Sequence, residues 1–153
     1  LEAVDQAEED YGYEAFFDSI DTTLMGHNTF KQILGFDVDW PYEGKQNFVF
    51  SRQPEGSNLA TVTDEDPVSL VRRLKREEGK DIWLVGGSQI NGALLKADLI
   101  DRIILTLVPV FLGEGISLFN GPVPEFPWNV VEADAYDNGF LLLTYERASY
   151  APA

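Results

Sequence analysis

The most constraining feature of this sequence is a short apolar run that ends in two glycines and continues into a helix-forming segment. The run is Ile82-Trp83-Leu84-Val85, the glycines are Gly86 and Gly87, and a helix is predicted over Ser88–Lys96. Such a run is typical of a buried strand in a parallel sheet. The helix N-terminus has free N–H groups and a partial positive charge, and glycine lets a ligand approach the backbone. The turn therefore predicts an anion site, although a tight strand-to-helix turn favours the same residues for structural reasons alone.

Two other segments place a turn directly after a predicted strand. The first strand ends at Gly26 and is followed by a brief helix over Phe30–Leu34, which Asn28 or Thr29 is expected to cap. The second strand is Asn47–Ser51, and a turn rich in Pro, Gly and Ser follows it. Ligands of parallel sheets lie beyond the carboxyl ends of the strands. The three turns are therefore expected to converge, although neither G-x-G-x-x-G nor a Walker motif occurs.

The order of predicted elements indicates an α/β fold with a mostly parallel sheet, helices on both faces and an antiparallel C-terminal hairpin. An Asn-Gly pair between two strand-like runs is a strong hairpin pattern. A single domain over residues 1–153 is expected at this length. The remaining predicted elements are a helix in the second half of Leu1–Ile20, a weak strand at Ala60–Val62, a helix from Asp66 to Gly79, a strand over Arg102–Val108, and hairpin strands Asn129–Tyr136 and Phe140–Arg147.

Composition excludes several classes of function. The chain has no cysteine, which removes disulfides, thiolate nucleophiles and cysteine-rich metal sites, and no metal site is predicted. Its formal net charge of −15 disfavours nucleic acid and anionic membranes as partners. No apolar run approaches the ~20 residues of a membrane-spanning helix, and the expected location is the cytoplasm.

Three motifs in order resemble the dihydrofolate reductase superfamily, whose members show Met-Gly-Arg-x-Thr, a Ser-Arg or Ser-Ser strand end, and an apolar strand with Gly-Gly. The matching residues are Met25–Thr29, Ser51-Arg52 and Val85–Gly87. The later stretch Pro109–Phe119 is similar to the P-x-x-L-G-x-G-x-x-L-F pattern of the riboflavin-biosynthesis reductases. The chain is therefore identified as a stand-alone member of the RibD C-terminal branch, with a dihydrofolate reductase-like three-layer fold.

This resemblance implies an NADPH-dependent reductase of a small heterocyclic or carbonyl/imine substrate, similar to the 5-amino-6-(5-phosphoribosylamino)uracil reductase domain. It also implies a homodimer. It selects no catalytic residue, and the identity of the substrate stays open. The implied substrate-binding residues are Thr106 and Glu114. The implied cofactor-binding residues are Gly26, His27, Asn28, Thr29, Ser51, Arg52, Gln53, Val85, Gly86, Gly87, Ser88, Gln89 and Ile90.

The chain departs from the family at two places. His27 stands where family members usually have the arginine that contacts the 2′-phosphate of NADPH, and Arg52, helped by protonated His27, is the hypothetical replacement. The alternatives are a solvated loop charge for Arg52 and a helix-capping residue for His27. In addition, nothing before Tyr11 resembles the family's central first strand. Either residues precede Leu1 in the natural protein, or the domain is modified where hydride transfer would occur.

Two alternatives of function remain. A non-catalytic nucleotide-binding or dimerisation module would fit the missing strand and His27. A dihydrofolate reductase proper would need an acid that binds the pterin, and Asp10, Glu14 and Asp18 lie in the appropriate helix without a register that selects one.

Overall fold

The structure is a computed structural model that describes residues 10–148. The contacts within it fall into two compact units. The first unit holds Glu14–Leu99 together with Ile116–Val123, and the second holds the remaining described residues. The expectation of one domain over residues 1–153 stays a prediction.

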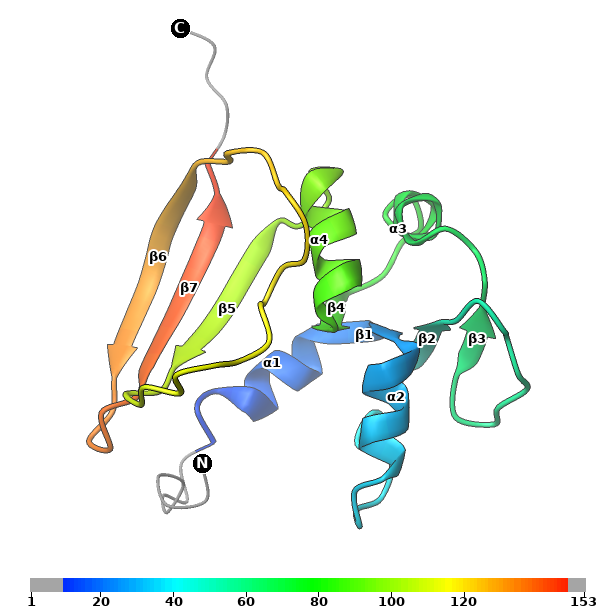
Figure 1. Cartoon of the computed structure of the whole chain (residues 1–153), viewed down its shortest axis with the longest axis horizontal. Helices are drawn as coiled ribbons and strands as arrows, with labels where there is room; N and C mark the ends of the chain where they lie inside the picture. Colours follow the sequence, from blue (N-terminus) through cyan, green and yellow to red (C-terminus); the bar gives the residue numbers. More distant parts are fainter. Residues whose placement is uncertain (1–9, 149–153) are drawn as a thin grey trace, which may run out of the picture. The chain divides into compact units, whose positions relative to one another are not determined.

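The first unit contains a four-stranded sheet in which every neighbouring pair is parallel (Figure 1). The strand order is β3-β2-β1-β4, so β1 lies inside the sheet and β4 lies at an edge among the described residues. The inner strand is almost fully buried, as expected for a strand covered on both faces. The strands are β1 (Ile20–Gly26), β2 (Gln46–Phe50), β3 (Thr61–Thr63) and β4 (Asp81–Gly86).

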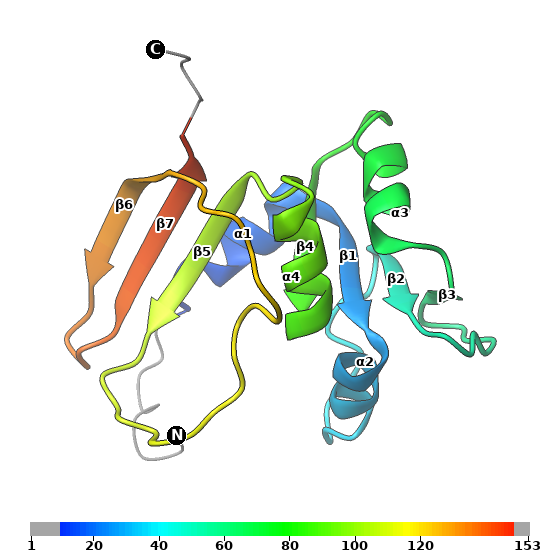
Figure 2. The ribbon, with the colours of Figure 1, turned by 45° about the horizontal axis from the view of Figure 1, so that its top comes forward.

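Helices cover both faces of this sheet (Figure 2). On one face, α2 packs its buried Phe30 and Ile33 against Met25 of β1. On the other face, Ile90 of α4 lies against Gly26. Successive residues of a strand point to opposite faces of the sheet, so Gly26 and its neighbour Met25 face opposite sides. The helices are α1 (Tyr13–Ser19), α2 (His27–Leu34), α3 (Pro67–Leu74) and α4 (Ser88–Lys96).

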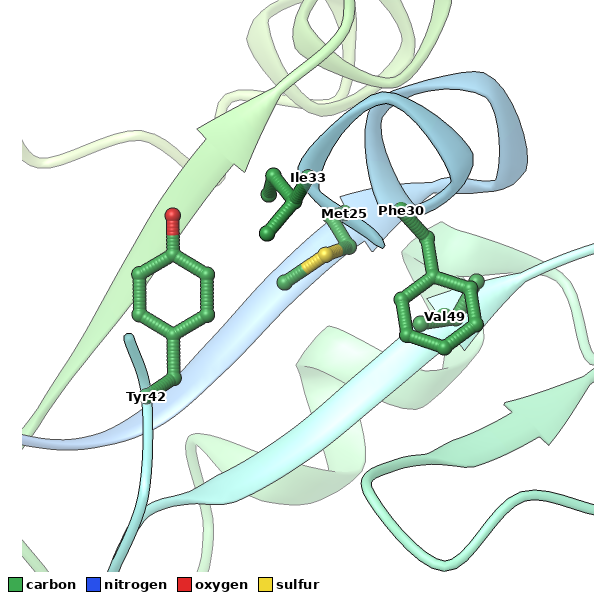
Figure 3. Packing of buried hydrophobic residues seen from close by; sticks show 5 residues of the cluster. All are labelled: Met25, Phe30, Ile33, Tyr42 and Val49. Carbon is green, nitrogen blue, oxygen red and sulfur yellow. The ribbon is translucent and has the colours of Figure 1, made fainter. Parts of the chain in front are cut away.

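The core under α2 consists of five buried apolar side chains from the sheet, the helix and the following loop (Figure 3). Met25 and Val49 on neighbouring strands have no exposed surface. Beside them, the buried Thr23 hydroxyl donates a 2.6 Å hydrogen bond to Oδ1 of Asn47, so this polar pair is satisfied within the sheet. The five core residues are Met25, Phe30, Ile33, Tyr42 and Val49.

The second unit contains a three-stranded antiparallel sheet of order β5-β7-β6. The turn between β6 and β7 is the predicted Asn-Gly turn: Gly139 has a φ of 88°, and Oδ1 of Asn138 accepts from the amide of Phe140. Nδ2 of Asn138 also donates to the hydroxyl of Tyr11, whose ring stacks on Phe140 at 5.5 Å. The predicted hairpin is therefore confirmed. The strands are β5 (Arg102–Leu107), β6 (Trp128–Ala135) and β7 (Leu141–Arg147).

The predicted fold class is confirmed, and three details differ. First, α2 begins at His27 rather than Phe30, because Gly26 in an extended conformation is its N-cap; Asn28 and Thr29 therefore lie within the helix and do not cap it. Second, α3 ends at Leu74, well before Gly79, because residues 75–79 are charged or glycine and offer no apolar face to bury. Third, β5 pairs with β7 in a separate sheet instead of joining the parallel one.

Candidate functional site

The parallel register brings the three predicted turns to one edge of the sheet. Gly26 at the end of β1 is paired with Phe50 at the end of β2, and Met25 is paired with Gly86 at the end of β4. The pairing with β4 shifts between Leu24 and Met25, which leaves Val85 as the extra residue of a bulge. Bulges of this kind re-aim a strand and are frequent beside functional sites. The predicted convergence of the three strand ends is confirmed.

The backbones of Gly26 and Gly87 approach each other at this edge. A Cβ atom on Gly26 would lie 3.9 Å from the nitrogen of Gly87 and 3.5 Å from Cδ1 of Ile90. A Cβ atom on Gly87 would lie 3.5 Å from Oγ1 of Thr29. These are ordinary contact distances, so a methyl group would fit at either glycine. We call the residues of this close approach, which are Gly26, Thr29, Gly87 and Ile90, the glycine cradle.

Gly86 contributes a backbone conformation rather than an open surface. Its φ is +139°, a region that residues with a side chain rarely adopt, and the residue is buried. The peptide bond between Gly86 and Gly87 is cis.

Two helix N-termini adjoin the cradle, and neither has a side-chain cap. The N-caps are Gly26 for α2 and Gly87 for α4, and in both helices no side chain accepts a hydrogen bond at the cap. In contrast, Asp66 caps α3 by accepting a 2.9 Å bond from the amide of Ser69. No side chain therefore competes for the first-turn N–H groups of α2 and α4, and both helix dipoles favour an anion there.

The side chains of α2 near the cradle differ in exposure. His27 is half-buried, and its Nδ1 is buried with no hydrogen-bond partner in the described part of the chain. Asn28 is exposed, whereas Thr29 is half-buried and faces Gly87. A buried ring nitrogen without a partner is costly, so His27 is the α2 side chain most in need of an external hydrogen bond.

The turn after β2 is ordered by its own serine. The amide of Ser51 donates to the carbonyl of Thr63, and its hydroxyl both donates to the carbonyl of Gln53 and accepts from the amide of Gln53. Ser51 therefore shapes the turn. Arg52 at its tip is exposed and makes no ion pair with another described residue. Its guanidinium is free to bind an anion.

The other predicted residues lie as follows. On α4, Ser88 is half-buried, Gln89 is exposed and Ile90 is buried in the wall of the cradle. Thr106 and Glu114 belong to the second unit: Thr106 is exposed on β5 opposite Leu142, and Glu114 is exposed in the loop that follows. Their role toward a substrate stays a prediction.

Three residues that adjoin the helix after the Gly86-Gly87 turn were not predicted from the sequence as part of the site. Asn91 and Gly92 of α4 and Asn120 of the segment Ile116–Val123 lie against one another. The isolated glycine inside a helix was the available indication, since such a residue costs helix stability unless it serves packing or function.

The described residues hold neither a helix that could span a membrane nor a cluster of metal-ligating side chains. None of their helices combines the length and apolar character needed to cross a membrane. In residues 10–148, no three or more His, Cys, Asp or Glu side chains gather as they would around a metal ion.

Comparison with known proteins bears on this geometry. The family model described as the RibD C-terminal domain matches residues 14–142. This chain belongs to the RibD C-terminal domain family. Membership accounts for the order of the three motifs and for the dihydrofolate reductase-like fold.

Two relatives from Bacillus subtilis (strain 168) are similar in sequence. The uncharacterized protein YwjB is 35% identical over 117 residues, which cover 75% of this chain and 67% of the relative. The uncharacterized protein YyaP is 31% identical over 148 residues, covering 89% of this chain and 79% of the relative.

Two solved structures are similar in fold. A protein from Shewanella sp. PV-4, named as a candidate riboflavin biosynthesis protein, has a TM-score of 0.82 at 28% identity, covering 94% of this chain and 83% of that one. A pyrimidine reductase-like protein from Corynebacterium diphtheriae NCTC has a TM-score of 0.67 at 12% identity, covering 93% and 83%. The latter likeness shows the fold alone.

Proposed function

We propose that this protein is a reductase that binds NADPH at the glycine cradle and reduces a small heterocyclic or carbonyl/imine substrate. The observation that supports this most strongly is the meeting of two uncapped helix N-termini at closely approaching glycines. In a molecule with a net charge of −15, such a concentration of free amides is the means by which an anionic cofactor can be held.

The residues of the cradle fit a dinucleotide diphosphate. The backbone amides at Gly87, Ser88 and Gln89 would donate to it from α4, and those at His27 and Asn28 would donate from α2. Side chains at Gly26 or Gly87 would fill the space that the diphosphate needs. When bound, the nicotinamide supplies the hydride, so the protein needs to position the two partners and exclude water.

Arg52 and His27 are proposed to distinguish NADPH from NADH. Arg52 extends from the end of β2 without an ion pair among the described residues, and guanidinium is well suited to a phosphate. The unpartnered Nδ1 of His27 would gain a hydrogen bond from a bound group or, when protonated, add a charge. Ser51 and Gln53 would hold the turn beside the adenosine.

The substrate is proposed to resemble a pyrimidine of riboflavin biosynthesis, that is, the substrate class of 5-amino-6-(5-phosphoribosylamino)uracil reductases. Support comes from family membership and from the name of the structural neighbour from Shewanella. Thr106 and Glu114 are the proposed substrate contacts. A homodimer in the cytoplasm is the proposed working form.

Titration with NADPH, followed by nicotinamide fluorescence, tests the proposed binding. Absorbance of the reduced nicotinamide in the presence of pyrimidine, carbonyl, imine and dihydrofolate substrates then tests turnover. Binding with oxidation by a pyrimidine or carbonyl/imine substrate is the expected result. Binding without oxidation by any of these would favour a nucleotide-binding module, oxidation by dihydrofolate alone would favour a dihydrofolate reductase, and no binding would refute the proposal.

A further inference from the structure

The segment Ile116–Val123 runs alongside α4 and is fastened to it within the first unit (Figures 1 and 2). The amide of Asn120 donates a 2.9 Å hydrogen bond to the carbonyl of Ser88, the first residue of the helix. One turn later, Nδ2 of Asn91 donates a 2.9 Å bond to the carbonyl of Leu118. We call Ile116–Val123 the α4 strap.

Gly92 allows the strap to approach the helix. A Cβ atom on Gly92 would collide with the carbonyl oxygen of Asn120 and would lie 3.2 Å from both its carbonyl carbon and its amide nitrogen. The obstructing atoms are backbone, which cannot rotate aside as a flexible side chain can. Alanine at an ordinary helical position is more favourable than glycine, so the glycine at this position is explained by the strap rather than by the helix.

Asn91 also holds the strap against α4, although its side-chain oxygen has no hydrogen-bond partner among the described residues. The residue is 9% exposed, and its Oδ1 is buried without a hydrogen-bond partner among the described residues. An apolar residue would avoid that penalty on the buried side of α4. Within residues 10–148, the one hydrogen bond that the side chain makes joins the helix to the strap.

The bond to Ser88 acts on the proposed cofactor site through a single peptide plane. The carbonyl of Ser88 and the amide of Gln89 belong to the same rigid unit and point in opposite directions. The helix already orients this plane, so the bond from Asn120 adds a second constraint on the amide of Gln89, a first-turn donor of α4 that no side chain caps.

We infer that Asn91 and Gly92 are positioning residues, which seat the α4 strap so that it aims the first-turn amides of α4 at the dinucleotide diphosphate. This inference rests on the proposed function, because it names how the same site is organised. Neither residue touches the cofactor in this account. A displacement of the strap alters the direction of the amides without removing any of them.

The test compares Gly92→Ala and Asn91→Leu with the exposed neighbour Ala93→Ser as a matched control. The dissociation constant for NADPH is measured by nicotinamide fluorescence well below the unfolding temperature, and circular dichroism gives the folded fraction. A displacement of about 1 Å can lower the activity of a site by up to roughly a hundredfold. We therefore expect both strap variants to bind NADPH about tenfold more weakly per folded molecule, and the control to be unchanged. Hydrogen exchange should accelerate at the amide of Asn120, which loses its bond to the carbonyl of Ser88 when the strap is displaced, and stay constant in β1.

The outcomes separate this inference from the function on which it rests. If the unaltered protein does not bind NADPH, the proposed function fails. If it binds and both strap variants bind equally well per folded molecule, the positioning role is wrong and the proposed function stands. Should Gly92→Ala fail to fold, Asn91→Leu decides the matter, and unchanged exchange at the amide of Asn120 would also overturn the inference.

Discussion

Gly26 and Gly87 approach each other at the ends of neighbouring parallel strands, so closely that a Cβ atom on Gly26 would lie 3.9 Å from the amide nitrogen of Gly87. Each glycine is also the N-cap of the helix that follows it. The relationship therefore brings two helix N-termini together at the place where we propose that an anion binds. Cofactor binding, in our account, depends on this space remaining open.

Gly87→Ala and Gly26→Ala should weaken NADPH binding without harming the fold. The added methyl groups meet only ordinary van der Waals distances within the protein, but they would intrude on the proposed place of the diphosphate. We expect a loss of about tenfold in affinity, equivalent to ~1.4 kcal/mol. Gly56→Ala, in an exposed loop where a Cβ meets nothing within 4 Å, is the control, and isothermal calorimetry is the measurement. Undiminished affinity in both cradle variants would contradict the proposed location.

Arg52→Ala should reduce affinity for NADPH and leave affinity for NADH unchanged, because only NADPH has a 2′-phosphate. The guanidinium is exposed, so solvent screening limits the effect to about tenfold for NADPH. Arg76→Ala removes the same charge from an exposed turn and serves as the control. The ratio of the two dissociation constants is the quantity to follow. An equal loss for both cofactors would show that Arg52 does not read the phosphate.

Asp21 should stabilise the fold in a pH-dependent manner. Its carboxylate accepts a 2.7 Å bond from the amide of Lys80 and a 2.9 Å bond from the hydroxyl of Thr22. The bond from the Lys80 amide is the main cause that lowers the pKa of Asp21 in the folded state, and the Thr22 bond adds to it. The stabilisation is therefore complete above about pH 4 and is lost as the pH falls through the folded-state pKa.

Urea unfolding of Asp21→Asn tests that prediction against Asp81→Asn, an exposed acid at the start of β4. At neutral pH, Asp21→Asn should cost on the order of 1 kcal/mol, because the weaker amide acceptor replaces a charged one. The difference between Asp21→Asn and the unaltered protein should shrink as the pH is lowered below about 4. A difference that is constant with pH would show that the charge has no part in it.

Phe111→Ser should shift the proposed homodimer toward monomer. Phe111 is fully exposed at 105%, and its neighbour Leu112 is 69% exposed, so this loop presents apolar surface that a second copy would cover. Light scattering across a dilution series measures the effect. A dimer of unchanged dissociation constant in the variant would exclude this loop from the interface, and a monomeric unaltered protein would refute the proposed homodimer.

The parts of the fold that depend on local pattern were predictable from the sequence. The bounds of α4 follow from the Gly-Gly turn and the lysine at its end, and the hairpin follows from Asn138-Gly139. The start of α2 at His27 could not be predicted, because His27 is a weak helix former and the cap is a glycine without a side-chain bond. The separate sheet of β5 was equally hidden, since its pairing with β7 joins residues far apart in sequence.

The candidate site was likewise predictable from the sequence only in part. The three turns could be located because strand ends of a parallel sheet share an edge. The contact of Gly92 with Asn120 joins residues that no motif connects, and no motif indicates that the Ser51 hydroxyl holds its own turn. Such contacts depend on how the chain packs in three dimensions, which periodicity does not encode.

The most direct test of a dinucleotide held at the glycine cradle is an NMR titration of the backbone amides with NADPH. The largest shift changes should occur at Gly26, Gly87 and Gln89, with smaller changes at Arg52. Saturable binding that leaves these amides unmoved and shifts another region of the protein, or no binding at all, would contradict the account.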